Sequence, residues 1–229
     1  MDLKQKAAQR ALDFVGSGMV LGLGSGSTSA YFVNMLGEKL KTGELRGIIG
    51  VATSEATAAQ ARALNIPITT LAKHPILDLA VDGADEVDPQ LNLIKGLGRA
   101  LLREKVVEIH AQQFVVIVDQ SKLVKRLGLR GPLPVEIIQF EADSHISWLN
   151  TLPGCQATVW LEKDGTRVLT DNGNNLALCR FETGIADAYA IAQEMAVRPG
   201  IVENGLFLDM ATQVIVAGEQ GVSLLERPK

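Results

Sequence analysis

Aromatic residues and cysteines are both scarce in this chain, and each scarcity excludes a class of protein. Only 4% of the 229 residues are aromatic, so a core drawn from 47% hydrophobic residues must consist mainly of aliphatic side chains. Cys155 and Cys179 are too few for a disulfide framework, and neither they nor the three histidines have metal-ligand spacing. We therefore expect no metal site and a reducing, cytoplasmic location. A plastid stays open as an alternative for a processed chain.

Long apolar runs and concentrations of like charge are also missing. The longest apolar runs, such as 114–118, fall far short of the roughly 20 residues that span a bilayer. The net charge is −4 and the pI about 5.5, with lysine and arginine spread along the chain. Neither nucleic acid nor a membrane is thus an expected partner. The N-terminal residues are charged where a signal peptide needs an apolar stretch, so we expect a helix there.

Short apolar segments alternate with amphipathic ones up to residue 130. Strands are predicted at 19–24, 47–52, 66–70, 77–81 and 114–118. Helices of roughly 10 to 15 residues separate most of them, and the last is predicted over Arg99–His110. This alternation predicts an α/β fold, a Rossmann-like and mostly parallel sheet with helices on both faces.

The pattern changes near Gly131. The predicted order is then a strand at 135–140, a helix at 141–152, strands from 157 and 167 joined by a hairpin turn, and a helix at 185–195. Such an order is typical of a smaller ferredoxin-like α+β domain. Leu206–Met210 and Gln213–Ala217 are predicted strands that rejoin the first domain. We therefore expect a main domain of residues 1–130 and 205–229 and a small domain of residues 131–204.

The glycine-rich segment 22–28, Gly-Leu-Gly-Ser-Gly-Ser-Thr, lies at a predicted strand-to-helix junction. Exposed backbone N–H groups and the helix dipole favour an anion there. Ser27 stands where a dinucleotide fingerprint has its third glycine, and the next strand ends without the expected acidic residue, which argues against a nicotinamide dehydrogenase. Taken alone, the segment fits an anion site and a capped tight turn equally well.

Five carboxylates crowd into the fourth predicted strand and the stretch just after it. They are Asp78, Asp82, Asp85, Glu86 and Asp88. The pair Asp82 and Asp85 comes at the carboxyl end of a strand, where ligands bind in open α/β sheets. Taken alone, an Asp-Gly turn with solvated carboxylates is the simpler interpretation.

A lysine on a glycine loop and a helical glutamate complete the set of candidate groups. In Lys95-Gly96-Leu97-Gly98 the glycines let backbone N–H groups approach a ligand, and the lysine can stabilise developing negative charge. Glu104, early in the next helix, is by itself an ordinary surface carboxylate. Lys122 is either a phosphate ligand or a solvated loop lysine. Together these groups predict an acid–base site for a small anionic substrate.

Six motifs in a fixed order closely resemble the type A ribose-5-phosphate isomerase family over nearly the whole chain. They are GLGSGSTSAYF, VDGADEVD, LIKGLGRALLREK, VDQSKLV, GPLPVEI and TDNGN. The resemblance implies the two-domain fold described above and interconversion of ribose 5-phosphate and ribulose 5-phosphate, in pentose phosphate metabolism or carbon fixation. It also implies a sugar-phosphate substrate, no metal or organic cofactor, and a homo-oligomer, either a dimer or a tetramer.

The family's roles carry over by motif. Glu104 would be the general base that moves a proton between C2 and C1 through an enediolate, and partial shielding from water would raise its pKa toward the working pH. Asp82, Asp85 and Lys95 would assist ring opening and proton transfer on the sugar oxygens. The implied substrate contacts are Ser25, Gly26, Ser27, Thr28, Asp82, Gly83, Ala84, Asp85, Lys95, Gly96, Leu97, Gly98, Lys122 and Lys4. Of these, Ser27, Thr28, Lys122 and Lys4 would lie near the phosphate.

Leu97 and Arg99 depart from the family loop, which is usually KGGG or KGRG followed by a small residue. Lys95, Gly96 and Gly98 remain, so the oxyanion geometry is expected to persist. Arg99 has two open interpretations, a cation next to the substrate and a side chain that faces solvent.

Two other functions remain as alternatives, a non-catalytic sugar-phosphate sensor and an acyl-CoA transferase with a glutamate nucleophile. A sensor has no need of a carboxylate at Glu104, and such transferases are generally longer chains. We therefore rank the isomerase first.

Overall fold

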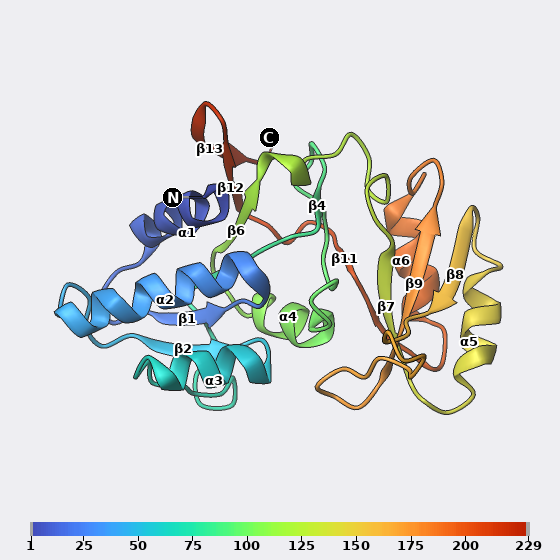
Figure 1. Ribbon diagram of the computed structural model, residues 1–229, viewed down its shortest axis with the longest axis horizontal. Helices are drawn as coiled ribbons and strands as arrows, with labels where there is room; N and C mark the ends of the chain where they lie inside the picture. The colour runs from blue at the N-terminus through green and yellow to red at the C-terminus, as the bar shows by residue number, and fades with distance from the viewer. Residues whose placement is uncertain (1, 228–229) are drawn as a thin grey trace. The chain divides into compact units, whose positions relative to one another are not determined.

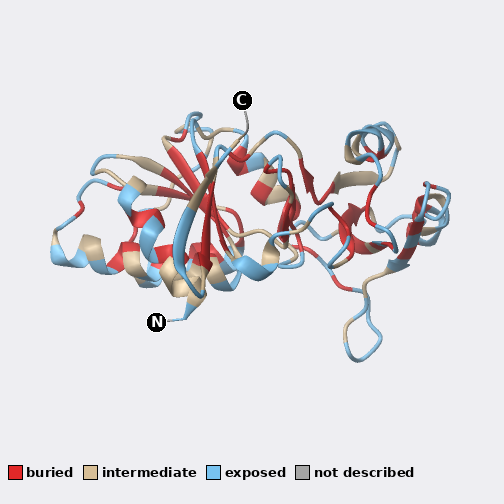
Figure 2. Cartoon of the chain, turned by 90° about the horizontal axis from the view of Figure 1, so that it is seen from above, coloured by how far each residue is buried: buried red, intermediate tan, exposed pale blue. Residues whose placement is uncertain are grey.

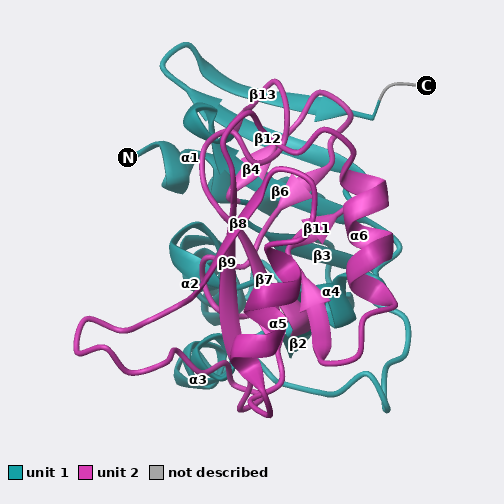
Figure 3. Cartoon of the chain, turned by 90° about the vertical axis from the view of Figure 1, so that its right-hand side faces the viewer, with its two compact units in different colours: residues 1–84, 103–122, 210–229 teal, residues 85–102, 123–209 magenta. Residues whose placement is uncertain are grey.

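The computed structural model describes residues 2–227 (Figure 1), and the chain forms two compact units (Figure 3). Unit 1 comprises the chain up to residue 84, residues 103–122 and the chain from residue 210, whereas unit 2 comprises residues 85–102 and 123–209. Both units therefore combine segments that are far apart in the sequence. The predicted domain boundaries after residues 130 and 204 stay a prediction.

A six-stranded sheet forms the centre of unit 1, in the order β13-β12-β6-β3-β1-β2. Its strands are β1 (Val20–Leu23), β2 (Ile49–Ala52), β3 (Leu79–Asp82), β6 (Phe114–Asp119), β12 (Gln213–Gly218) and β13 (Gly221–Glu226). All neighbours are parallel except β12 and β13. Because β2 and β3 flank β1 on opposite sides, the strand order reverses at β1, as in Rossmann-like folds. The prediction of a mostly parallel sheet is confirmed.

Helices cover both faces of this sheet. They are α1 (Leu3–Ala11), α2 (Gly26–Thr42), α3 (Glu55–Ala63) and α4 (Leu101–Glu108). Leu21 and Leu23 of β1 pack in one cluster with buried side chains of α1, α2 and α3. Val20 belongs instead to a cluster with Val107 of α4, and a Cβ on Gly22 would lie 3.0 Å from that valine. Except for the edge strand β13, the strands of this sheet are therefore mostly buried, as Figure 2 shows in red.

Unit 2 contains a four-stranded antiparallel sheet in the order β10-β7-β9-β8. Its elements are β7 (Leu133–Ile137), α5 (Ala142–Leu149), β8 (Cys155–Val159), β9 (Asn175–Phe181), α6 (Ala188–Ala196) and β10 (Ile201–Asn204). Counted along the chain, the strands lie in the spatial order 4-1-3-2 with βαββαβ connectivity. This arrangement is ferredoxin-like, so the predicted α+β fold is confirmed.

A three-stranded sheet of β4 (Glu86–Val87), β5 (Leu93–Ile94) and β11 (Leu206–Phe207) completes unit 2. Of the two strands predicted to follow residue 205, β12 pairs with β6 of the parallel sheet, whereas β11 covers only Leu206–Phe207 and pairs with β5. Gly205 provides the physical reason. Its N–H donates to Pro134 O at 2.8 Å and its carbonyl accepts from Lys95 N at 2.9 Å, which holds the chain beside β5.

Some predicted elements are shorter in the structure. The strand expected at 66–70 is a single bridge between Ile68 and Gly50, because Pro67 has no N–H to donate. The helix expected over Arg99–His110 extends only over α4, since Arg99 has a left-handed backbone with φ 69°. Short 3₁₀ helices follow α1 (Leu12–Phe14) and β6 (Gln120–Lys122). Within residues 2–227, no helix has the length and apolar character to cross a membrane.

Candidate active site

Asp82 ends β3 with a side chain that is only 1% exposed. The parallel register places Leu23 of β1 opposite Val81, so the residues that follow the two strands meet at their carboxyl ends. A Cβ on Gly24 would lie 2.1 Å from Asp82 Oδ1, so only glycine permits this approach. The sequence thus brings the glycine-rich segment and Asp82 together at the point where the strand order reverses.

Three donors converge on Oδ1 of Asp82. They are the Ser25 N–H at 2.9 Å, the Ser29 hydroxyl at 2.7 Å and the Gly83 N–H at 2.7 Å. Hydrogen bonds to a carboxylate are strong, so this set fixes the orientation of Asp82. Ser29, which is fully buried in α2, was not among the residues predicted from the sequence. The available indication was a serine among the apolar positions of the predicted helix.

The hydroxyl of Ser25 is engaged within the protein. It forms hydrogen bonds with Thr53 Oγ1 at 2.7 Å and Ser54 Oγ at 2.8 Å, and Ser54 in turn caps α3. These bonds tie the beginning of α2 to the beginning of α3. The first turn of α2, residues 26–28, is exposed or half-buried and presents its N-terminal end, where an anion is favoured.

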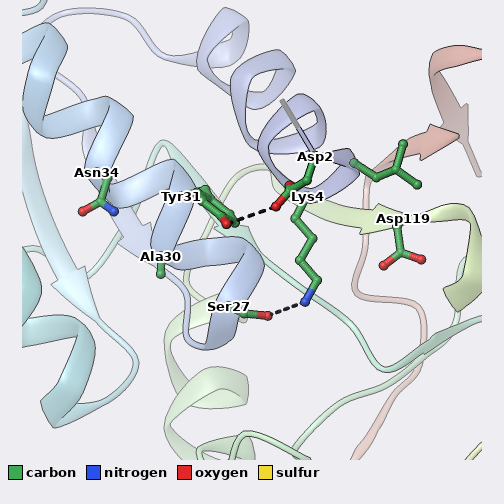
Figure 4. A pocket seen from close by; sticks show the side chains of 8 residues that line it. Asp2, Lys4, Ser27, Ala30, Tyr31, Asn34 and Asp119 are labelled. Atoms are coloured by element: carbon green, nitrogen blue, oxygen red, sulfur yellow. Dashed lines mark hydrogen bonds between the residues drawn. The ribbon is translucent and has the colours of Figure 1, made fainter. Parts of the chain in front are cut away.

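Lys4 of α1 reaches this first turn. Its Nζ donates to Ser27 Oγ at 2.8 Å, and Figure 4 shows the two side chains pointing at each other. Both residues line a cavity of about 540 Å³ whose other lining residues are Asp2, Leu3, Ala30, Tyr31, Asn34 and Asp119. An ammonium group beside a helix N-terminus is a favourable environment for a phosphate.

Asp2 holds α1 in place beside α2. It caps α1 by accepting a hydrogen bond from the Gln5 N–H, which lowers the pKa of the Asp2 carboxyl. It also accepts a bond from the Tyr31 hydroxyl at 3.1 Å, and this bond raises the pKa of Tyr31. The position of Lys4 therefore depends on a cap and a cross-helix bond at the same N-terminus.

Lys95 and its glycine loop are fixed within unit 2. Lys95 follows β5, is 2% exposed, and places its Nζ 5.4 Å from the centre of the Phe207 ring. The Leu97 N–H donates to Asp85 Oδ2 at 2.9 Å, which folds the loop back onto the acidic stretch. Gly96 has φ 109°, and a Cβ there would lie 2.8 Å from the Leu101 side chain. The loop backbone is thus one that glycine alone adopts without strain.

The other three crowded carboxylates have structural partners. Asp78 accepts the N–H of Val20 at 2.7 Å, and Asp88 accepts two N–H groups of the turn that follows it. Glu86, only 1% exposed, accepts three backbone N–H groups of segment 128–131 at 2.6 to 2.9 Å. The acidic stretch therefore combines Asp82 and Asp85 with carboxylates that hold strands and loops.

Glu104 and Lys122 come from the elements around β6. Glu104 lies in the first turn of α4 and is 4% exposed, which departs from the surface position that its charged neighbours suggest. Lys122 is half-buried at the end of the 3₁₀ helix after β6. Asp82, Glu104 and Lys122 belong to unit 1, whereas Asp85 and Lys95 belong to unit 2. Among residues 2–227 there is no group of three or more His, Cys, Asp or Glu side chains that could hold a metal ion.

Comparison with curated proteins gives close relatives over nearly the full length. The chain is 48% identical to "Ribose-5-phosphate isomerase A" of Roseiflexus castenholzii, over 98% of this chain and 95% of that protein. It is 47% identical to "Probable ribose-5-phosphate isomerase 3, chloroplastic" of Arabidopsis thaliana, over 99% of this chain and 83% of that protein.

Solved structures and a family model agree with these relatives. A D-ribose-5-phosphate isomerase in complex with phospho-erythronic acid superposes with a TM-score of 0.95 at 43% identity, covering 99% of this chain and 100% of that chain. The enzyme of Plasmodium falciparum also has a TM-score of 0.95, at 35% identity with 99% of each chain covered. The family model described as "Ribose 5-phosphate isomerase A (phosphoriboisomerase A)" matches residues 49–221. The chain therefore belongs to the ribose 5-phosphate isomerase A family.

Proposed function

We propose that this protein is an aldose–ketose isomerase that interconverts D-ribose 5-phosphate and D-ribulose 5-phosphate through an enediolate. Family membership over nearly the whole chain supports this activity. The structural observation that carries it is the buried carboxylate of Asp82, held by three donors at the carboxyl end of β3 beside the beginning of α2. The comparisons support neither a sensor nor an acyl-CoA transferase.

Glu104 is the proposed general base. The hydrogen on C2 of the open-chain aldose is weakly acidic because the neighbouring C1 is a carbonyl carbon, so a positioned carboxylate is needed to remove it. Glu104 takes this proton as the C1–C2 double bond forms, and it then returns a proton to C1 to give the ketose. Its low exposure of 4% limits competing proton exchange with bulk water.

Asp82, Asp85 and Lys95 handle the sugar oxygens. The Lys95 ammonium and the N–H groups of residues 96–98 stabilise the negative charge that develops on the enediolate oxygen. The two carboxyl groups move protons between the oxygens during ring opening and as the carbonyl shifts from C1 to C2. Gly83 and Ala84, which lie between the two aspartates in the sequence, are further proposed substrate contacts. The Asp85 carboxylate also orients the loop, because it accepts the Leu97 N–H.

The phosphate end of the substrate is proposed to bind at the first turn of α2. Ser27 and Thr28 supply hydroxyl groups there, and Gly26 and Ser25 supply the tight backbone that starts the helix. Lys4 supports this placement because its Nζ lies 2.8 Å from Ser27 Oγ. Lys122 supplies the second proposed cation. Two cations at a helix N-terminus suit a dianionic phosphate.

The activity is tested by following ribose 5-phosphate in D2O by NMR. Isomerisation produces ribulose 5-phosphate, and any deuterium that enters at C1 reports proton transfer through an exchangeable base. Binding of the sugar phosphate without turnover would instead favour the sensor. Trapping of a glutamyl-CoA thioester by hydroxylamine in the presence of an acyl-CoA would favour the transferase.

We further infer that the protein acts in the cytoplasm, in the pentose phosphate pathway, as a homodimer. Buried free cysteines suit a reducing compartment, although the Arabidopsis relative named above is chloroplastic. Large apolar side chains that are 62% to 77% exposed, namely Ile76, Ile109, Val197 and Phe140, are candidates for a subunit interface. Light scattering should give about twice the 24.5 kDa chain mass, and cell fractionation tests the location.

A further inference from the structure

Arg99 has an unusual backbone conformation at the end of the glycine loop. Its φ of 69° is left-handed, and its N–H donates to Gly96 O at 2.9 Å to close a turn. A residue with a Cβ adopts this conformation only at a cost in free energy that glycine avoids. Favourable contacts of the Arg99 side chain would offset this free-energy cost.

The guanidinium of Arg99 is anchored on two side chains of unit 2. It donates two hydrogen bonds to the Glu162 carboxylate, with Nη2 to Oε2 at 3.1 Å. Its Cζ also lies 5.3 Å from the centre of the Trp160 ring. A planar fork that pairs with a carboxylate and stacks on an aromatic ring is a geometry specific to arginine. The sequence left open a cation next to the substrate and a side chain that faces solvent. The structure instead pairs the guanidinium of Arg99 with Glu162 and Trp160.

The anchor residues are themselves fixed by backbone hydrogen bonds. Trp160 N donates to Leu176 O of β9 at 2.7 Å, and Trp160 O accepts from Val168 N at 2.9 Å. Glu162 N donates to Thr166 O at 2.7 Å across the predicted hairpin turn. Trp160 and Glu162 therefore extend the antiparallel sheet, and their backbone hydrogen bonds fix the two side chains that Arg99 contacts.

The loop 95–98 is held at three points. Lys95 N bonds to Gly205 O and Leu97 N bonds to Asp85, both at 2.9 Å, and these contacts fix its beginning and middle. Gly98 is exposed, and a Cβ built on it would meet nothing within 4 Å. The end of the loop is held by the side chain of Arg99.

We propose that Arg99 is a positioning residue that, through Glu162 and Trp160, fixes the loop carrying Lys95 and the N–H groups of residues 96–98. This inference rests on the proposed function, in which those groups face the enediolate oxygen. Donors that stabilise a developing charge act only when they are held in place, and a displacement of about 1 Å can cost about a hundredfold in rate.

The test compares Arg99→Ala, Glu162→Ala and the double variant, with kcat and KM measured separately. Both single variants should lower kcat about tenfold with a smaller change in KM, and the double variant should be no slower than either. Arg99→Lys should be intermediate, because lysine keeps the charge but loses the fork.

Arg167→Ala is the matched control. Arg167 bonds to both oxygens of Asp143 at 2.8 and 2.9 Å in the same unit, with a similar exposure of its side chain to that of Arg99. In the described part of the chain, the Arg167 side chain forms its hydrogen bonds and its ion pair with Asp143 and none with residues 95–98. Its removal should leave kcat unchanged.

A second measurement separates this inference from the proposed function. Amide hydrogen exchange of residues 96–99 should become about tenfold faster in Arg99→Ala and Glu162→Ala, even if the protein had no isomerase activity. Unchanged exchange would overturn the anchor. If wild type turns over and Arg99→Ala is slow while Glu162→Ala keeps the wild-type kcat, the guanidinium touches the substrate itself and the positioning role is wrong. An inactive wild type would overturn the proposed function and, with it, the catalytic part of this inference.

Discussion

The Ser29 hydroxyl donates a 2.7 Å hydrogen bond to Asp82 Oδ1 and accepts one of 3.1 Å from the Gly83 N–H. The two side chains come from α2 and the end of β3, 53 residues apart, and both are almost fully buried. The helix whose first turn forms the proposed phosphate site therefore also orients the proposed acid–base group. Packing of α2 on the sheet couples the two ends of the proposed substrate site.

Replacing Ser29 with alanine should lower both stability and kcat. A hydrogen bond to a charged group contributes about 2 kcal/mol, and its loss also frees Asp82 to rotate. Urea unfolding and steady-state kinetics measure the two effects. Ser147→Ala is the control, because its hydroxyl bonds only to a backbone carbonyl on an exposed part of α5. Wild-type stability and kcat in Ser29→Ala would show that the hydroxyl does not orient Asp82.

Gly24→Ala should be destabilised by about 1 to 3 kcal/mol, with a matching loss of activity. The added methyl would lie 2.1 Å from Oδ1 of Asp82, which cannot move without breaking the bonds that hold it. Gly16→Ala is the control in the same unit, because its methyl would meet only the flexible end of Met19 at 3.4 Å. Equal midpoints of thermal unfolding for the two variants would contradict the close approach.

Glu86→Ala should unfold at a clearly lower urea concentration than wild type. Its loss leaves three backbone N–H groups of segment 128–131 without their acceptor, a cost of about 3 kcal/mol or more. Glu219→Gln, in the exposed turn between β12 and β13, should leave the midpoint unchanged. A wild-type midpoint for Glu86→Ala would mean that water replaces the carboxylate at no cost.

Lys4→Met should raise the KM for ribose 5-phosphate about tenfold, which corresponds to about 1.4 kcal/mol of binding free energy, with little change in kcat. The physical reason is that Lys4 bonds to Ser27 at the proposed phosphate site and is not among the groups proposed to act on the reacting carbons. Inhibition by inorganic phosphate should weaken in parallel. Lys41→Met, an exposed charge near the other end of α2, should alter neither. A change in kcat with an unaltered KM would place Lys4 outside the phosphate site.

Cys155 should react with iodoacetamide at lower pH than Cys179. A hydrogen bond with Cys179 lowers the pKa of the Cys155 thiol, and the same bond together with burial raises the pKa of Cys179. Because the thiolate is the reactive form, Cys179→Ala should move the alkylation midpoint of Cys155 to higher pH. Peptide mass spectrometry across a pH series measures both. Faster labelling of Cys179, or a midpoint of Cys155 that does not move, would contradict the pairing.

The parallel sheet could be predicted because its strands are short, apolar and separated by helices, which is a local property of the sequence. The pairing of strands in unit 2 could not be predicted from such local properties. The hairpin turn at 163–166 is present, but its arms share one bridge, between Leu161 and Arg167, because the chain turns again after Thr170. The strand that pairs along the whole of β8 is β9. On its other side β9 pairs with β7, which lies far away in the sequence.

The candidate site also has some features that could be predicted from the sequence and others that could not. The glycine-rich segment and Asp82 follow predicted strands, so their meeting at the sheet edge follows from topology. The burial of Glu104 could not be predicted in this way, because its neighbours Arg103 and Lys105 are typical of a surface helix and only tertiary packing covers Glu104. Ser29 and Glu162 were missed since their partners lie more than 50 residues away in the sequence.

The most direct test of the account compares wild type with Glu104→Gln in excess EDTA. Ribulose 5-phosphate formation from ribose 5-phosphate is the readout, and binding of the sugar phosphate to the variant shows that the site persists. We expect wild type to keep its activity under chelation, whereas the variant loses kcat by about a hundredfold or more with little change in binding. Near-full activity in Glu104→Gln would contradict the account and move the search for the base to Asp82 and Asp85.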